Sequence, residues 1–138
     1  MSRPHIEGNI FRGRLPHGKN FPQAIPQLIQ QLAAVMTVPL TELDYSFQSL
    51  RMIDRFAFKQ LGRYQCLEPY VFEPLVAYCG EIVRQRSGGR WEMRLAANEP
   101  TWEPWIVAPD GTLDCPGGRV FEALWELDSP ESIASLIW

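Results

Sequence analysis

The segment 69–95, PYVFEPLVAYCGEIVRQRSGGRWEMRL, contains the change of pattern that decides the fold. Over residues 69–86 the apolar side chains recur at helical spacing, which predicts an amphipathic helix. Ser87-Gly88-Gly89 ends this helix, because glycine adopts left-handed backbone angles without the steric cost of a Cβ atom. From Arg90 to Leu95 the apolar residues alternate instead, which is typical of a half-buried strand.

Two more helices are predicted upstream, because apolar residues recur at helical spacing over residues 22–36 and 46–61. Pro22 suits the first turn of the first helix, while Pro26 leaves a later start open, since proline is tolerated only in the first turn. Ser46 is suited to cap the second helix, because its hydroxyl can accept a hydrogen bond from an unpaired backbone N–H. Gly62 is the expected end of that helix.

Short elements are predicted after residue 95. Trp105-Ile106-Val107 is the expected second strand, and Pro109-Asp110-Gly111 is a turn sequence. Thr112-Leu113 begins a third strand, and Pro116-Gly117-Gly118 is expected to interrupt the chain. Residues 119–127 fit a helix slightly better than a strand, so both interpretations stay open at this point.

The C-terminal residues predict one last helix. Asp128 has the features of an N-cap, with Pro130 and Glu131 at the positions of a first turn and a capping box. Apolar residues follow at helical spacing, and we expect the Ile-Trp ending to dock on the rest of the domain.

The order of these elements predicts an α+β fold, with N-terminal helices packed on one face of a small antiparallel sheet and a short C-terminal helix. Residues 1–138 show no repeat and no linker, so we expect a single domain. Residues 1–20 combine glycine, proline and charge without a period, which predicts a flexible or loosely packed arm.

Several classes of function lack support in the composition. No apolar run approaches the ~18 residues that span a bilayer, and no signal-peptide pattern occurs, so we expect a cytoplasmic protein without a membrane partner. Cys66, Cys79 and Cys115 have neither zinc-ligand nor disulfide spacing, and His5 and His17 stand apart from them. We therefore expect no metal, no cofactor and no catalytic site.

The charges are unevenly distributed around a net charge of −3. Residues 1–91 carry eleven Lys and Arg against seven Asp and Glu, whereas residues 92–138 carry two against nine. Four basic residues recur at helical spacing: Arg51, Arg55, Lys59 and Arg63. Such a stripe could contact phosphates. Because the whole chain is acidic, we do not expect nucleic acid as a partner, and we expect a solvated face that pairs in part with Asp54 or Glu68.

The last 48 residues contain five tryptophans, a residue enriched at interaction hot spots. We expect Trp91 and Trp125 in the core. The segment 100–105, PTWEPW, is acidic and bounded by prolines, so at least one of its tryptophans is a candidate for a binding surface. The predicted binding residues are Trp102, Glu103, Trp105, Asp110 and Asp114.

One stretch resembles a known type of protein. The residues Tyr78-Cys79-Gly80-Glu81 and Gly88-Gly89-Arg90-Trp91 resemble a Y-x-G-E…GG-x-W signature. It is similar to that of small bacterial domains of unknown function, some from toxin–immunity neighbourhoods. The segments 43–46 and 49–54 resemble the lead-in helix of such proteins, so the resemblance covers about residues 40–95. It implies a helix–turn–strand scaffold, and only weakly a function.

The signature also has a structural reading of its own. Its residues are Tyr78, Gly80, Glu81, Gly88, Gly89 and Trp91. Glycine inside a helix costs about 1 kcal/mol against alanine, so we expect another backbone to approach Gly80 closely. Glu81 would satisfy nearby donors, and Trp91 would pack back on the helix.

These features favour a non-enzymatic protein-binding domain of unknown specific role. It would be an immunity or accessory protein that binds a basic protein through its acidic, Trp-containing C-terminal half. The alternatives are a small enzyme that uses Glu81 or loop carboxylates, and a nucleic-acid binder that uses the basic stripe. The oligomeric state is open.

Overall fold

The computed structural model describes residues 10–97, 100–127 and 129–138. Its α-helices are α1 (Phe21–Met36), α2 (Phe47–Arg55), α3 (Pro69–Ser87), α4 (Pro116–Trp125) and α5 (Ser132–Ile137). Its strands are β1 (Arg90–Leu95), β2 (Trp102–Val107) and β3 (Leu113–Asp114). Short 3-10 turns lie at Gly18–Asn20, Leu40–Glu42 and Gln65–Leu67, and the π-helical turn η3 (Phe56–Leu61) extends α2.

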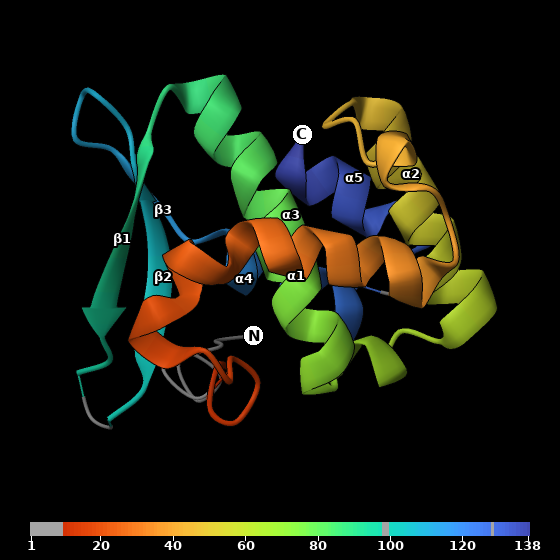
Figure 1. Ribbon diagram of the computed structural model, residues 1–138, viewed down its shortest axis with the longest axis horizontal. Coiled ribbons are helices and arrows are strands. Elements are labelled where there is room, and N and C mark those ends of the chain that lie inside the picture. The colour runs from red at the N-terminus through yellow and green to blue at the C-terminus, as the bar shows by residue number, and fades with distance from the viewer. Residues whose placement is uncertain (1–9, 98–99, 128) are drawn as a thin grey trace.

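The three strands form one antiparallel sheet in the order β1-β2-β3, and the helices lie on one side of it (Figure 1). The predicted α+β class is therefore confirmed. Helix α3 runs through the middle of the molecule and contacts α1 and α4, while α5 packs against both α2 and α4 (Figure 1). Among the described residues, no helix covers the second face of the sheet.

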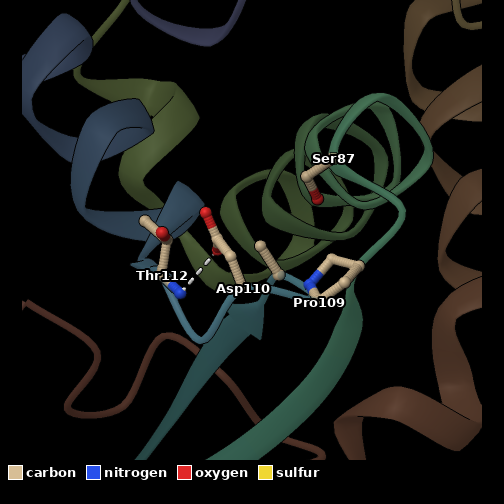
Figure 2. A pocket seen from close by; sticks show the side chains of 5 residues that line it. Ser87, Pro109, Asp110 and Thr112 are labelled. Carbon is tan, nitrogen blue, oxygen red and sulfur yellow. Dashed lines mark hydrogen bonds between the residues drawn. The ribbon is translucent and has the colours of Figure 1, made fainter.

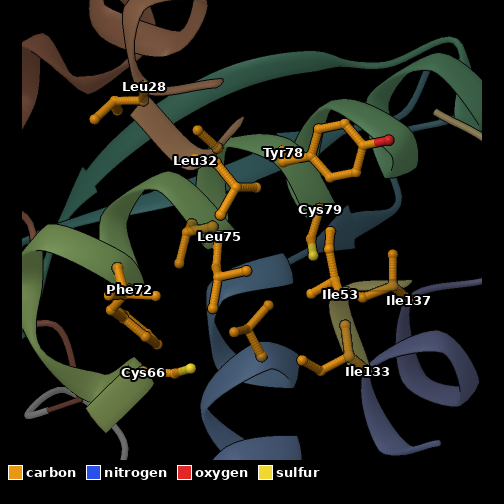
Figure 3. Packing of buried hydrophobic residues seen from close by; sticks show 14 of the residues in the cluster. Leu28, Leu32, Ile53, Cys66, Phe72, Leu75, Tyr78, Cys79, Ile133 and Ile137 are labelled. Atoms are coloured by element: carbon orange, nitrogen blue, oxygen red, sulfur yellow. The ribbon is translucent and has the colours of Figure 1, made fainter. Parts of the chain in front are cut away.

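The core lies between the helices (Figure 3). Helix α3 contributes an almost continuous set of buried residues, and its apolar side chains meet those of α1, α2 and α5 (Figure 3). The core residues labelled in Figure 3 include Leu28, Leu32, Ile53, Phe72, Leu75, Cys79, Ile133 and Ile137. Burial of both faces explains why this helix is apolar nearly all round.

The helix-end signals of the sequence are confirmed. The Ser46 hydroxyl accepts a hydrogen bond from the backbone N–H of Ser49 at 3.1 Å. Gly62 and Gly88 follow η3 and α3 with φ of 105° and 71°, which a side chain would strain. The first-turn position of Pro22 is confirmed, and the later start at Pro26 is wrong, because α1 begins at Phe21 and contains Pro26 in its interior. Pro26 is exposed, so water can solvate the carbonyl that loses its helical partner.

Two predictions near the C-terminal half change. Pro116-Gly117-Gly118 opens α4 instead of interrupting the chain, with the proline at the first position. A Cβ atom on Gly117 would lie 2.5 Å from a ring carbon of Phe11, so tight packing requires this glycine. The ambiguity over 119–127 is resolved as a helix that ends at Trp125, and β2 begins at Trp102, earlier than predicted.

The N-terminal arm also differs from its prediction. Ile10, Phe11 and Leu15 are buried in the core, so residues 10–20 are not loosely packed. At the other end, α5 docks as expected, and the Trp138 ring stacks against Arg86 with 4.0 Å between guanidinium carbon and ring centre. The predicted cap Asp128 lies outside the described residues.

Candidate functional site

The signature residues form a structural junction between α3 and β1. A Cβ atom on Gly80 would lie 2.1 Å from Cη2 of Trp91, so the indole ring occupies the space that the glycine leaves. The neighbour of Gly80 is thus a side chain and not the backbone that the sequence suggested. The indole Nε1–H donates to Oε2 of Glu81 at 2.6 Å. At the turn, a Cβ atom on Gly89 would lie 2.8 Å from the Val107 carbonyl oxygen.

Glu81 has a structural role in this junction. Besides the indole, it accepts two hydrogen bonds from Arg84, from Nε and Nη2, each at 2.9 Å. Burial by itself would raise the pKa of Glu81, but the hydrogen bonds from Arg84 and Trp91 outweigh it and lower the pKa below its ordinary value. A carboxylate with a lowered pKa is a poor general acid, because that role needs a proton held near neutral pH.

Tyr78 joins the junction to the lead-in segment. Its ring is fully buried, and its hydroxyl accepts a hydrogen bond from the backbone N–H of Tyr45 at 2.8 Å. The same hydroxyl lies 2.6 Å from Oγ of Ser49. The two tyrosine rings stack with centres 5.2 Å apart. Burial raises the pKa of Tyr78 to about 12, so the phenol keeps its proton and serves as a structural hydrogen-bonding group.

Asp54 makes a tertiary contact that its position in the sequence did not indicate. Its two carboxylate oxygens accept hydrogen bonds from the backbone N–H groups of Ile133 and Ala134, at 2.8 and 2.9 Å. These groups belong to the first turn of α5, so α2 caps a helix about 80 residues away in sequence. Asp54 is 1% exposed and cannot serve as a surface partner of the basic stripe. Burial raises its pKa to about 6.

A buried carboxylate on α3 holds the N-terminal segment in place. Glu73 is 3% exposed, and its oxygens contact the backbone N–H of His17 at 2.9 Å and the ring Nδ1 of His17 at 2.8 Å. The sequence did not reveal this pair, because His17 and Glu73 lie 56 residues apart. The sequence did contain one indication of the contact: Glu73 stands among apolar residues of the third helix, and a buried carboxylate requires a hydrogen-bond partner. His5 lies outside the described residues.

The five predicted binding residues do not form one surface. The pleat places Trp102 on the same face as the buried Ile106, whereas Glu103 and Trp105 lie on the opposite face. Asp114 lies on β3, and its Oδ2 forms an ion pair with Nη2 of Arg119 at 2.7 Å. The two tryptophans of the PTWEPW segment are both partly buried, and Lys19 lies over the Trp102 ring at 5.9 Å.

Asp110 lies beside a shallow depression at the turn between β2 and β3 (Figure 2). The depression measures about 500 Å³ and is lined by Ser87, Ala108, Pro109, Asp110 and Thr112. The Asp110 carboxylate accepts a hydrogen bond from the backbone N–H of Thr112 at 2.9 Å, so it stabilises the turn (Figure 2). The depression is open to solvent and is formed mainly by the turn between β2 and β3. Ligand pockets usually enclose most of the ligand surface, which this depression does not do.

The basic stripe is shorter than predicted. Arg51, Arg55 and Lys59 are exposed along α2 and η3. Arg63 leaves the stripe, because its guanidinium stacks on Tyr64 at 4.7 Å and donates to the Leu127 carbonyl oxygen at 2.9 Å. Three residues on one helical face remain as a possible contact for phosphates or acidic groups.

Several large apolar side chains are exposed on the segment that follows Arg63 and at the end of α4. We define the aromatic patch as Tyr64, Tyr70, Trp125 and Leu127. Their exposed fractions are 56%, 47%, 50% and 36% in that order. The prediction that Trp125 is a core residue is therefore wrong. The rings of Trp125 and Tyr64 meet edge to face at 5.6 Å, and Gln65 donates to the Tyr70 hydroxyl at 3.0 Å.

Comparisons with protein-family models, with curated proteins and with solved structures gave no match to this chain. Within the described ranges, no three His, Cys, Asp or Glu side chains gather as a metal site would require. No described helix has the length and apolar character needed to cross a bilayer. The three thiols are free, and burial raises the pKa of Cys66 and of Cys115 to about 12, which makes them poor nucleophiles.

Proposed function

We propose that this protein is a non-enzymatic protein-binding domain that holds its partner through the aromatic patch. The observation that carries this proposal is the edge-to-face pair of Tyr64 and Trp125, two large side chains that are each about half exposed. Exposed aromatic residues that gather beside an arginine have the composition of an interaction hot spot.

The patch is held in a fixed shape before any partner binds. Trp125 packs on Phe121, with ring centres 6.1 Å apart, and Phe121 is buried. The Arg63 guanidinium stacks on Tyr64 and donates to the Leu127 carbonyl, so it ties two members of the patch together. Rigid aromatic groups lose little conformational entropy on binding, which favours affinity.

The charge of the C-terminal half favours a basic partner. Residues 92–138 have nine Asp and Glu against two Arg, and Glu122 and Glu126 lie on or beside the last turn of α4, close in sequence to Trp125. An acidic surface speeds the encounter with a basic protein. We therefore move the centre of the binding region from the PTWEPW segment to the aromatic patch, to which the acidic half contributes Trp125 and Leu127. An immunity or accessory protein that occludes such a partner is the finer form of this proposal.

The alternatives have less support. An enzyme built on Glu81 would need a carboxyl free to exchange protons, whereas this carboxylate accepts hydrogen bonds from both Arg84 and Trp91. Nucleic-acid binding would rest on Arg51, Arg55 and Lys59 alone, on a chain of net charge −3. Direct phosphate contacts by three side chains give weak, salt-sensitive binding.

The test is affinity capture from a lysate of the source cell with three baits. These are the wild type, the double variant Tyr64→Ala/Trp125→Ala, and the control Trp105→Ala, which alters the partly buried tryptophan on the open face of the sheet. We expect the wild type and the control to retain the same basic protein and the double variant to lose it. The captured pair should then dissociate more readily as salt is raised.

Equal capture by all three baits would move the binding surface away from the patch. Loss only in Trp105→Ala would return it to the surface that the sequence predicted. Circular dichroism of each bait controls for unfolding, which we do not expect because the altered patch side chains are half exposed.

A further inference from the structure

We propose that the free edge of β1 pairs with β1 of a second copy of this chain, so that the two sheets join into one. This inference concerns self-association and uses a surface other than the aromatic patch. It goes beyond the proposed function and does not depend on it. The strand order β1-β2-β3 places β1 at an edge of the sheet, on the outer left in Figure 1. Such an edge offers backbone groups to another strand.

The hydrogen bonds between β1 and β2 show which backbone N–H and C=O groups of β1 face its free edge. The backbone N–H of Ala96 donates to the Thr101 carbonyl oxygen at 2.8 Å, so this residue faces β2. Along an antiparallel strand the residues face the neighbour and the free edge in turn. The backbone N–H and C=O groups of Trp91, Met93 and Leu95 are therefore directed at the free edge. In the described sheet β1 pairs with β2 alone, so no further strand is there to bond these outward groups.

Pro104 supports this assignment independently. It lies opposite Met93 in the register of β1 and β2. Proline has no N–H to donate, so it fits only where its partner strand does not require a hydrogen bond. Met93 must then direct its own backbone groups away from β2, as the Ala96 bond also indicates.

The side chains of β1 favour pairing with another β1. Its uncovered face carries Arg90, Glu92 and Arg94, in alternating sign. An edge protected against association commonly carries charges that repel an identical strand. In an antiparallel pair centred on Met93, Glu92 of each copy lies opposite Arg94 of the other, which gives two attractive contacts by symmetry. This register extends over residues 90–96.

The same charges disfavour the neighbouring register. A pair centred on Glu92 would place the two Glu92 side chains together and each Arg90 against Arg94 of the other copy, and like charges opposite one another are destabilising. A pair centred on Trp91 restores attraction between Arg90 and Glu92, but it is shorter because α3 ends at Ser87. The charge pattern and the available length thus select the register centred on Met93.

The groups involved are accessible. Glu92 is 33% exposed, and although it already contacts Arg90 at 3.1 Å and Arg94 at 2.6 Å, a carboxylate can accept further hydrogen bonds. Leu95 is 54% exposed at the end of the strand. In the selected register Leu95 lies opposite Trp91 of the second copy, so an apolar side chain gains cover on the helical face of the sheet.

The test combines sedimentation equilibrium with charge reversal. Wild type is compared with Glu92→Arg, with Arg94→Glu and with the double variant Glu92→Arg/Arg94→Glu over a wide range of protein concentration. We expect the wild type to dimerise, each single variant to weaken the dimer by about tenfold to a hundredfold, and the double variant to restore it. Arg90→Glu is the matched control, because Arg90 faces no charge in the selected register.

A second readout follows the backbone. Hydrogen exchange of the peptide that contains Trp91, Met93 and Leu95 should slow with rising protein concentration in the wild type and not in the single variants. A wild type that stays monomeric at all concentrations overturns the proposal. So does a dimer that both single reversals leave intact, since its interface must then lie elsewhere. Weakening by Arg90→Glu would replace the selected register with the one centred on Trp91.

Discussion

Replacement of Gly80 by alanine should destabilise this protein, against the usual preference of helices for alanine. In an exposed helix the change gains about 1 kcal/mol. Here the new Cβ atom would lie 2.1 Å from Cη2 and 2.6 Å from Cζ2 of Trp91. Carbon atoms in contact lie about 3.5–4.0 Å apart, so the indole ring has to move by more than ~1 Å.

The ring has little freedom to move. Its Nε1–H is bound to Glu81 at 2.6 Å, and its edge meets the Phe21 ring with centres 5.3 Å apart. Overpacking costs about 1–3 kcal/mol, and the loss of a hydrogen bond to a charged group costs about 1.5–3 kcal/mol. After the helix gain is subtracted, we expect Gly80→Ala to lower the free energy of unfolding by roughly 1.5–5 kcal/mol.

Urea denaturation of four proteins tests this reasoning: the wild type, Gly80→Ala, Trp91→Leu, and the double variant. With the indole removed, the same alanine should be neutral or stabilising by up to about 1 kcal/mol, so the effect of Gly80→Ala changes sign between the two backgrounds. A cost that is equal in both backgrounds would falsify the assigned contact. A gain in stability with Trp91 present would show that the ring yields freely.

Two further predictions concern buried polar groups. Burial raises the pKa of Asp54 from 3.8 to about 6, so between these values the folded protein holds a proton that the unfolded chain has released. The free energy of unfolding of the wild type should therefore fall by at most about 3 kcal/mol as pH rises through this window. Urea titrations of Asp54→Asn should not show this decline. An identical pH profile in the two proteins would contradict the prediction. Tyr78→Phe removes the acceptor of the Tyr45 backbone N–H and the partner of the Ser49 hydroxyl. It should lower the free energy of unfolding, measured by the same assay, by about 1–3 kcal/mol. A neutral effect would mean that water replaces the hydroxyl.

Local physics explains what the sequence revealed about the fold. The helices at 21–36, 47–61 and 69–87 and the strand at 90–95 follow from the spacing of apolar residues, which repeats within a single element. The cap at Ser46 and the left-handed turn at Gly88 depend on groups within a few residues, so they were also predictable. The packing of Trp91 back on α3 was predictable because the intervening turn is short, whereas its hydrogen bond to Glu81 was seen only in the structure.

The misassigned residues depend on partners distant in sequence. Pro116-Gly117-Gly118 reads as an interruption, yet Gly117 is required because the Phe11 ring packs against it. Asp54 looked like a surface partner for arginines, but it caps α5 from the opposite end of the chain. Trp125 has the residue type of a core position, and its exposure depends on where α4 ends.

The sequence by itself determined the class of fold, the order of three helices followed by a small sheet, and the acidic character of the C-terminal half. Only the tertiary structure decided which groups are exposed together. The pleat of β2 separated Trp102 from Trp105, and the packing of α4 brought Trp125 next to Tyr64. The physical reason is that periodicity fixes the face of an element on which a residue lies, whereas the neighbours of that face depend on contacts between segments that are far apart in sequence.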